Sequence, residues 1–99
     1  MKLLTATIKP YKLDALMDEL LEVELIEIRV ADFKSYASRR GHIETYRGTE
    51  RNVALIPKVQ IQILAEKESL IKADEIIKKY RDEGDDGNDI AFISDVTLV

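Results

Sequence analysis

The spacing of the hydrophobic residues alternates between the period of a strand and that of a helix, and this alternation most limits the possible folds. Leu4, Ala6 and Ile8 alternate with Leu3, Thr5 and Thr7, which is typical of a strand that ends before Pro10. The next apolar residues recur three and four apart, as on one face of an amphipathic helix: Leu13, Leu16, Met17, Leu20 and Leu21. We expect this helix to end near residues 23–24.

The same alternation returns along the rest of the chain. Residues 26–30 predict a second strand, and residues 34–52 follow neither period, which indicates a long functional loop. Residues 53–65 predict a third strand, with a bulge or break at Pro57. The closing elements are a helix capped by Ser69 or a neighbour, with apolar positions from Leu70 to Tyr80, and a strand over about residues 90–98.

The order strand, helix, strand, loop, strand, helix, strand predicts one α+β fold. It corresponds to the ferredoxin-like βαββαβ unit, with a four-stranded antiparallel sheet and two helices on one face. A chain of 99 residues has room for a single domain, 1–99. The second face of the sheet carries Leu, Ile and Val among polar residues and has no layer to cover it. We therefore expect the chain to form oligomers.

Charge is distributed unevenly along the chain. Residues 29–58 carry seven basic and three acidic side chains, a net of +4, whereas residues 82–99 carry six acidic side chains and none that are basic. The basic segment either meets an anionic ligand or partner, or is a soluble surface clustered by chance. The overall charge of -4 and the few aromatic residues argue against binding of nucleic acid.

Few residue patterns support chemistry. The single histidine, His42, lies in the long loop without a recognisable partner, and the chain has no cysteine, so we expect neither an enzyme nor a metal site. The acidic run at 82–89 has the wrong spacing for a calcium loop and is interpreted as a solvated turn. No apolar run approaches the ~18 residues of a membrane span, and a cytoplasmic protein that does not insert into membranes is expected.

Three blocks of sequence, at 8–14, 41–50 and 57–61, carry a family resemblance. They read IKPYKLD, GHIETYRGTE and PKVQI, and with them the whole chain resembles the PII nitrogen-regulatory signalling family, as a divergent PII-like member. The resemblance implies a homotrimer packed through its bare sheet faces. It also implies a T-loop at about 34–52 that docks onto a membrane transporter or metabolic enzyme. A B-loop at about 82–89 and the base of the T-loop then bind small effectors between subunits.

Departures from the family pattern refine this expectation. Arg51 stands where the family has a modifiable tyrosine, which excludes uridylylation there, and Arg39 replaces a glutamine that helps to bind magnesium and 2-oxoglutarate. Lys58 resembles the lysine that pairs with 2-oxoglutarate. In the B-loop Ile90 stands in place of a lysine, and three acids flank the glycines: Asp85, Asp86 and Asp89. Because carboxylates repel phosphates, we expect ADP or AMP rather than ATP, or bicarbonate, as effector.

The resemblance and the charges together give two sets of expected site residues. The effector set is Arg29, Lys58, Gln62, Gly84, Gly87 and Asn88. The partner-binding set in the T-loop is Arg39, Arg40, His42, Tyr46, Arg47 and Arg51. The expected function is signal transduction in nitrogen or inorganic-carbon metabolism, with no required cofactor. The alternative is a degenerate PII-like interaction module that binds its partner without sensing nucleotide.

Overall fold

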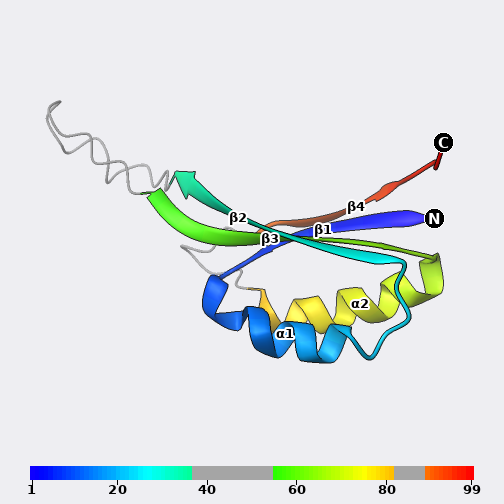
Figure 1. Ribbon diagram of the computed structural model, residues 1–99, viewed down its shortest axis with the longest axis horizontal. Coiled ribbons are helices and arrows are strands. Elements are labelled where there is room, and N and C mark those ends of the chain that lie inside the picture. Colours follow the sequence, from blue (N-terminus) through cyan, green and yellow to red (C-terminus); the bar gives the residue numbers. More distant parts are fainter. Residues whose placement is uncertain (37–54, 82–88) are drawn as a thin grey trace, which may run out of the picture.

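A computed structural model describes residues 1–36, 55–81 and 89–99, and these form the predicted α+β unit (Figure 1). The elements follow the predicted order: β1 (Lys2–Ile8), the short 3-10 helix η1 (Pro10–Lys12), α1 (Leu13–Leu20), β2 (Glu27–Tyr36), β3 (Leu55–Ala65), α2 (Lys67–Tyr80) and β4 (Ala91–Asp95). The remaining parts of the predicted T-loop and B-loop, at 37–54 and 82–88, lie outside the described residues.

The four strands pair in the order β2-β3-β1-β4, and all three pairings are antiparallel. This order places β3 between β1 and β2, as the split βαβ arrangement of the ferredoxin-like fold requires. Both helices lie on the same face of the sheet (Figure 1). The predicted fold class is therefore confirmed for the single chain.

The hydrophobic core lies between the sheet and the helices. Alternate residues of β1 and β3 point toward the helices, and each helix contributes residues spaced three or four apart. The buried set is Leu4, Ala6, Ile8, Val59, Ile61, Ile63, Ala65, Leu16, Leu20, Leu70, Ala73 and Ile77. Periodicity predicted most of this set because burial on one face is what imposes a period on a sequence. Leu13 and Met17, which the spacing placed on the same helical face, are only partly buried.

Helix α1 ends earlier than residues 23–24. Its last residue is Leu20, and the next turn is closed by hydrogen bonds from the amides of Glu22 and Val23 to carbonyls three residues earlier. Such tightened bonds commonly end an α-helix. As a result Leu21, which the helical spacing assigned to the apolar face, is exposed.

Strands β2 and β3 are longer than the hydrophobic pattern indicated. Strand β2 runs to Tyr36, opposite Leu55, so the loop start predicted at Lys34 is wrong. The end of β2 and the start of β3 reach past the helices (Figure 1), so no helix covers the sheet at this point. Without one buried face, these segments show no hydrophobic period in the sequence. The break predicted at Pro57 is also wrong, because β3 runs through this residue. Pairing of β1 with β3 ends at Val59, so at Pro57 the strand has only β2 beside it. A proline is tolerated where one side of a strand is unpaired.

Two further boundaries differ from expectation. Helix α2 starts at Lys67 with Glu66 at the N-cap and no side-chain capping bond, so Ser69 lies inside the helix rather than at its cap. Strand β4 covers Ala91–Asp95 rather than 90–98, since its partner β1 starts at Lys2, opposite Asp95. Beyond that point the amide of Val96 still donates a hydrogen bond to the carbonyl of Met1. Among the described helices none has the length and apolar character that crossing a membrane requires.

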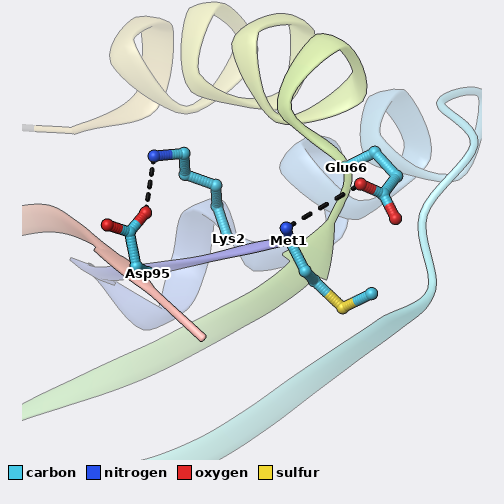
Figure 2. A network of polar contacts seen from close by, with 4 residues as sticks. All are labelled: Met1, Lys2, Glu66 and Asp95. Atoms are coloured by element: carbon cyan, nitrogen blue, oxygen red, sulfur yellow. Dashed lines mark hydrogen bonds and ion pairs between the residues drawn. The ribbon is translucent and has the colours of Figure 1, made fainter. Parts of the chain in front are cut away.

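Ion pairs join the elements at the end of the sheet that carries both termini. Lys2 Nζ lies 2.6 Å from Asp95 Oδ1, across the edge pair β1–β4, and the Met1 amino group lies 3.8 Å from Glu66 Oε1 at the start of α2 (Figure 2). The Asp95 side chain is 85% exposed. Water screens contacts of this kind, so they add little to stability.

A polar cluster also links the two helices on the outer surface. Glu19 of α1 accepts a hydrogen bond from Lys79 Nζ at 2.5 Å and another from the Tyr80 hydroxyl of α2. The bond from Lys79, then that from Tyr80, holds the pKa of Glu19 below its ordinary value of 4.5. The ionised carboxylate is thus the form that ties α1 to α2.

The lowered pKa of Glu19 predicts a contribution to stability that depends on pH. Because the folded pKa lies below the unfolded one, the contribution is complete above about pH 5 and is lost as the pH falls through the folded pKa. The change Glu19→Gln should lower the melting temperature at neutral pH and flatten its decline between about pH 5 and pH 3. Differential scanning fluorimetry over this range measures both effects, with Glu22→Gln as the exposed control. Equal slopes for wild type and Glu19→Gln would contradict the assignment.

Candidate functional site

A buried ion pair joins β3 to the segment that precedes β4. Lys58 Nζ lies 3.9 Å from Asp89 Oδ1, and the two side chains are only 6% and 0% exposed. The distance exceeds the 2.7–2.9 Å that is usual for a charge-assisted hydrogen bond, so the contact is mainly coulombic. Both charges have lost most of their water, which makes each dependent on the other.

The register of the sheet explains why these two residues meet. Ile8, the last residue of β1, pairs with Val59 on one side, and the amide of Thr7 bonds the carbonyl of Ile90 on the other. Lys58 directly precedes Val59 in the sequence, and Asp89 directly precedes Ile90. The end of β1 therefore brings together two residues that lie 31 positions apart in the sequence.

Lys58 also lines a cavity of about 500 Å³ at the end of the sheet where β2 ends and β3 begins. The walls combine apolar rings with charged groups from β2, β3 and the start of η1: Pro10, Asp32, Phe33, Lys34, Pro57 and Lys58. Its size is in the range of small-molecule sites. Of the charged wall residues only Lys58 is buried, and Lys34 and Asp32 are exposed.

The cavity has the composition of a binding site. Amines, one carboxylate and apolar rings recognise a ligand by charge and shape, and none of these wall residues supplies a positioned nucleophile with its base. In the described part of the chain, no three side chains of His, Asp or Glu gather where they could hold a metal ion. We interpret the cavity as a place for a small effector.

Two of the expected effector residues lie elsewhere on the sheet. Arg29 of β2 and Gln62 of β3 are direct register partners on the face away from the helices, and they line a smaller cavity of about 180 Å³. Arg29 pairs with Glu27 at 3.2 Å, and Gln62 Nε2 lies 3.4 Å from the Thr5 hydroxyl. Gln62 is four residues from Lys58 along β3, or about 13 Å at 3.3 Å per residue. A single chain does not bring this pair to Lys58.

The other predicted site residues lie outside the described residues. They comprise Gly84, Gly87 and Asn88 of the effector set, and Arg39, Arg40, His42, Tyr46, Arg47 and Arg51 of the partner-binding set. Their roles stay predictions.

Asp89 is the residue whose role sequence reasoning missed. It was recognised as a charge unfavourable to phosphate, but its pairing with Lys58 was not predicted. A signal was available in principle. Once β3 and β4 are both placed in register against β1, Asp89, which precedes Ile90, comes to lie near Lys58, which precedes Val59. That inference requires the strand register, which hydrophobic spacing alone does not supply.

The buried pair predicts a strong and non-additive effect on stability. Lys58→Met should lower the free energy of unfolding by about 3–5 kcal/mol, because it removes a cation that lies 3.9 Å from the buried Asp89 carboxylate. The double change Lys58→Met with Asp89→Leu should restore most of that loss. Urea denaturation of the single and double variants measures the coupling. Strictly additive losses would show that the two charges do not interact.

Comparison with known proteins places the chain among regulatory proteins. None of the protein-family models matches it. Curated relatives do: "Nitrogen regulatory protein P-II" of Mesorhizobium japonicum is 36% identical over 99 residues, which is 100% of this chain and 88% of that protein. The protein of the same name from Azospirillum brasilense has the same identity and coverage. "Nitrogen regulatory protein GlnK" of Escherichia coli is 31% identical, again over 100% of this chain and 88% of the relative.

These identities extend over the whole chain rather than over an isolated motif, and they agree with the βαββαβ fold and with the three sequence blocks. The relatives are named as regulators and not as enzymes. The chain belongs to the PII family of nitrogen-regulatory proteins.

Proposed function

We propose that this chain is a trimeric signal-transduction regulator. An adenine nucleotide, ADP or AMP rather than ATP, or alternatively bicarbonate, binds at clefts between subunits in the cytoplasm. Binding changes the state of the T-loop, which then controls a membrane transporter or metabolic enzyme of nitrogen or inorganic-carbon metabolism. Such control requires that the effector bind one state of the loop more tightly than the other.

The observation that carries the proposal is the uncovered face of the sheet. Both helices lie on one side (Figure 1), and the opposite side presents apolar residues from β1, β3, β4 and the C-terminal segment: Leu3, Leu64, Phe92, Val96 and Leu98. An exposed apolar face of this kind marks an interaction surface. Association through it supports clefts at which residues of neighbouring chains complete the effector site.

The change Phe92→Glu tests this surface. Phe92 is 55% exposed on the open face, opposite Thr5, so the variant should fold but lose its association. Sedimentation equilibrium should give three times the chain mass for wild type and the mass of one chain for Phe92→Glu. Ile71→Glu is a matched control, since Ile71 is 52% exposed but lies on α2. A monomeric wild type would overturn the proposal.

The charges around the cavity support an effector of low charge. Asp89 offsets the buried Lys58, and Asp32 contributes a second carboxylate to the surroundings of the cavity. Each further phosphate on a nucleotide adds repulsion toward these carboxylates. The proposed preference for ADP or AMP over ATP rests on this balance.

Calorimetry with AMP, ADP, ATP and bicarbonate tests the sensing role. We expect binding of AMP or ADP, and a weaker heat for ATP at the same concentration. The T-loop variant Arg47→Ala should leave nucleotide binding unchanged and weaken partner capture. Absence of binding for all four compounds would remove the sensing role.

The second candidate is an interaction module that does not sense nucleotide. The internal neutralisation of Lys58 favours it, because a permanently balanced site has less need of an anionic ligand. Pull-down of a partner with and without ADP separates the candidates. Capture that ADP changes supports the sensor, whereas capture that ADP leaves unaltered supports the module.

A further inference from the structure

We propose that Lys12 is a positioning residue for the cavity of about 500 Å³ where β2 ends and β3 begins. Its side chain bonds the end of α2 and so fixes η1, the short helix that supplies Pro10 to the cavity wall. Lys12 is not itself part of that wall, and it acts on the cavity through Pro10. This inference rests on the proposed role of the cavity as an effector site.

Little packing holds η1 (Pro10–Lys12) in place. It contains no buried residue, and its N-cap, Lys9, makes no side-chain capping bond. Tyr11 at its centre is 76% exposed. The hydrogen bond from the amide of Lys12 to the carbonyl of Lys9 shapes the turn but does not connect it to another element. A segment with so few buried contacts is easily displaced, so a bond to a neighbouring element has a large effect on where it lies.

The side chain of Lys12 makes such a bond. Its Nζ donates a hydrogen bond to the carbonyl oxygen of Tyr80 at 3.1 Å. Tyr80 is the last residue of α2, so its carbonyl has no amide partner one turn further along the helix. The C-terminal end of a helix also carries partial negative charge, which attracts an ammonium group. Both effects favour the contact between η1 and α2.

The end of α2 is itself held in place by other contacts. Ile77, one turn before the end, is completely buried, and the Tyr80 hydroxyl donates a hydrogen bond to the carboxylate of Glu19 on α1. Lys79 Nζ bonds the same carboxylate at 2.5 Å. None of these three contacts involves Lys12. The bond from Lys12 therefore ties a weakly packed segment, η1, to a well-packed one.

Pro10 connects this tie to the cavity. It is the first residue of η1, and it shares the cavity wall with Pro57 and Lys58 of β3. A wall that is already held in one position loses less conformational entropy when a ligand binds, and this preorganisation increases affinity. Loss of the Lys12 bond should therefore weaken binding although no group of the cavity wall has been removed.

A tryptophan reporter tests the positioning without any ligand. The chain has no tryptophan, so Phe33→Trp places a single indole in the cavity wall. In this background Lys12→Met should shift the indole emission to longer wavelength and increase its quenching by acrylamide, because displacement of η1 opens the wall to water. Lys12→Arg keeps a cationic donor and should restore the parent signal. Thermal melting followed by circular dichroism verifies that each variant is folded.

Lys79→Met is the matched control. It removes a lysine from the last turn of α2, together with a bond to Glu19, but leaves the bond between Lys12 and the Tyr80 carbonyl. Tyr11→Leu is a second control, since the Tyr11 ring lies 5.8 Å from Lys12 Nζ. Both should keep the parent signal. The inference is overturned if Lys12→Met leaves the signal unchanged, if Lys12→Arg does not restore it, or if either control changes it as much as Lys12→Met.

Calorimetry with ADP connects the position of η1 to binding. Lys12→Met should weaken ADP binding by about 5- to 10-fold, which corresponds to the cost of ordering one additional side chain. Lys12→Arg and Lys79→Met should bind ADP as wild type does. An ADP affinity that is unchanged in Lys12→Met would overturn the inference even where the indole signal has shifted.

The two measurements separate this inference from the proposed function. If wild type binds ADP but the indole signal does not respond to Lys12→Met, the inference fails alone. If the signal responds and Lys12→Arg restores it, but wild type does not bind ADP, then Lys12 positions the cavity wall and nucleotide sensing fails. If neither the signal responds nor ADP binds, both are wrong.

Discussion

The pairing of β1 with both of its neighbours is the constraint on which the rest of this structure depends. Its residues Leu4, Ala6 and Ile8 lie at the centre of the core, and its backbone bonds β3 on one side and β4 on the other. Because β3 and β4 each continue into a helix or a loop, their register on β1 also determines where those segments leave the sheet. The end of β1 at Ile8 is where Lys58 and Asp89 meet.

The two kinds of ion pair in this chain have different physical consequences. The contacts at the terminal end, such as Lys2–Asp95, are exposed and screened by water, and they add little energy. The pair Lys58–Asp89 is enclosed, so water screens the attraction between its two charges far less. A buried pair of this kind is weak evidence for stability in itself, because taking both charges out of water is costly.

Sequence reasoning was most accurate where one face of an element is buried. The core positions of β1, β3 and both helices followed from spacing, and the order of elements and the fold class followed from them. It was wrong about residues 34–36 and Pro57, which lie where the sheet extends past the helices and both faces meet solvent. Backbone hydrogen bonds hold those residues in the strands, and such bonds leave no trace in the pattern of side chains. The resemblance predicted Lys58 as a site residue, and that prediction stands untested, whereas the proximity of Asp89 to Lys58 was not predicted.

By itself the sequence determined the order of the secondary elements, most residues of the core and the resemblance to a family that relatives over the whole chain confirm. A period of 2 or 3.6 residues shows which side chains of a strand or helix are buried, so each element can be predicted from its own stretch of sequence. Only the tertiary structure decided the length of the β2–β3 extension, the separation of Arg29 and Gln62 from Lys58, and the burial of Lys58 against Asp89. Those features depend on the register between strands distant in sequence, and register is a property of the assembled sheet.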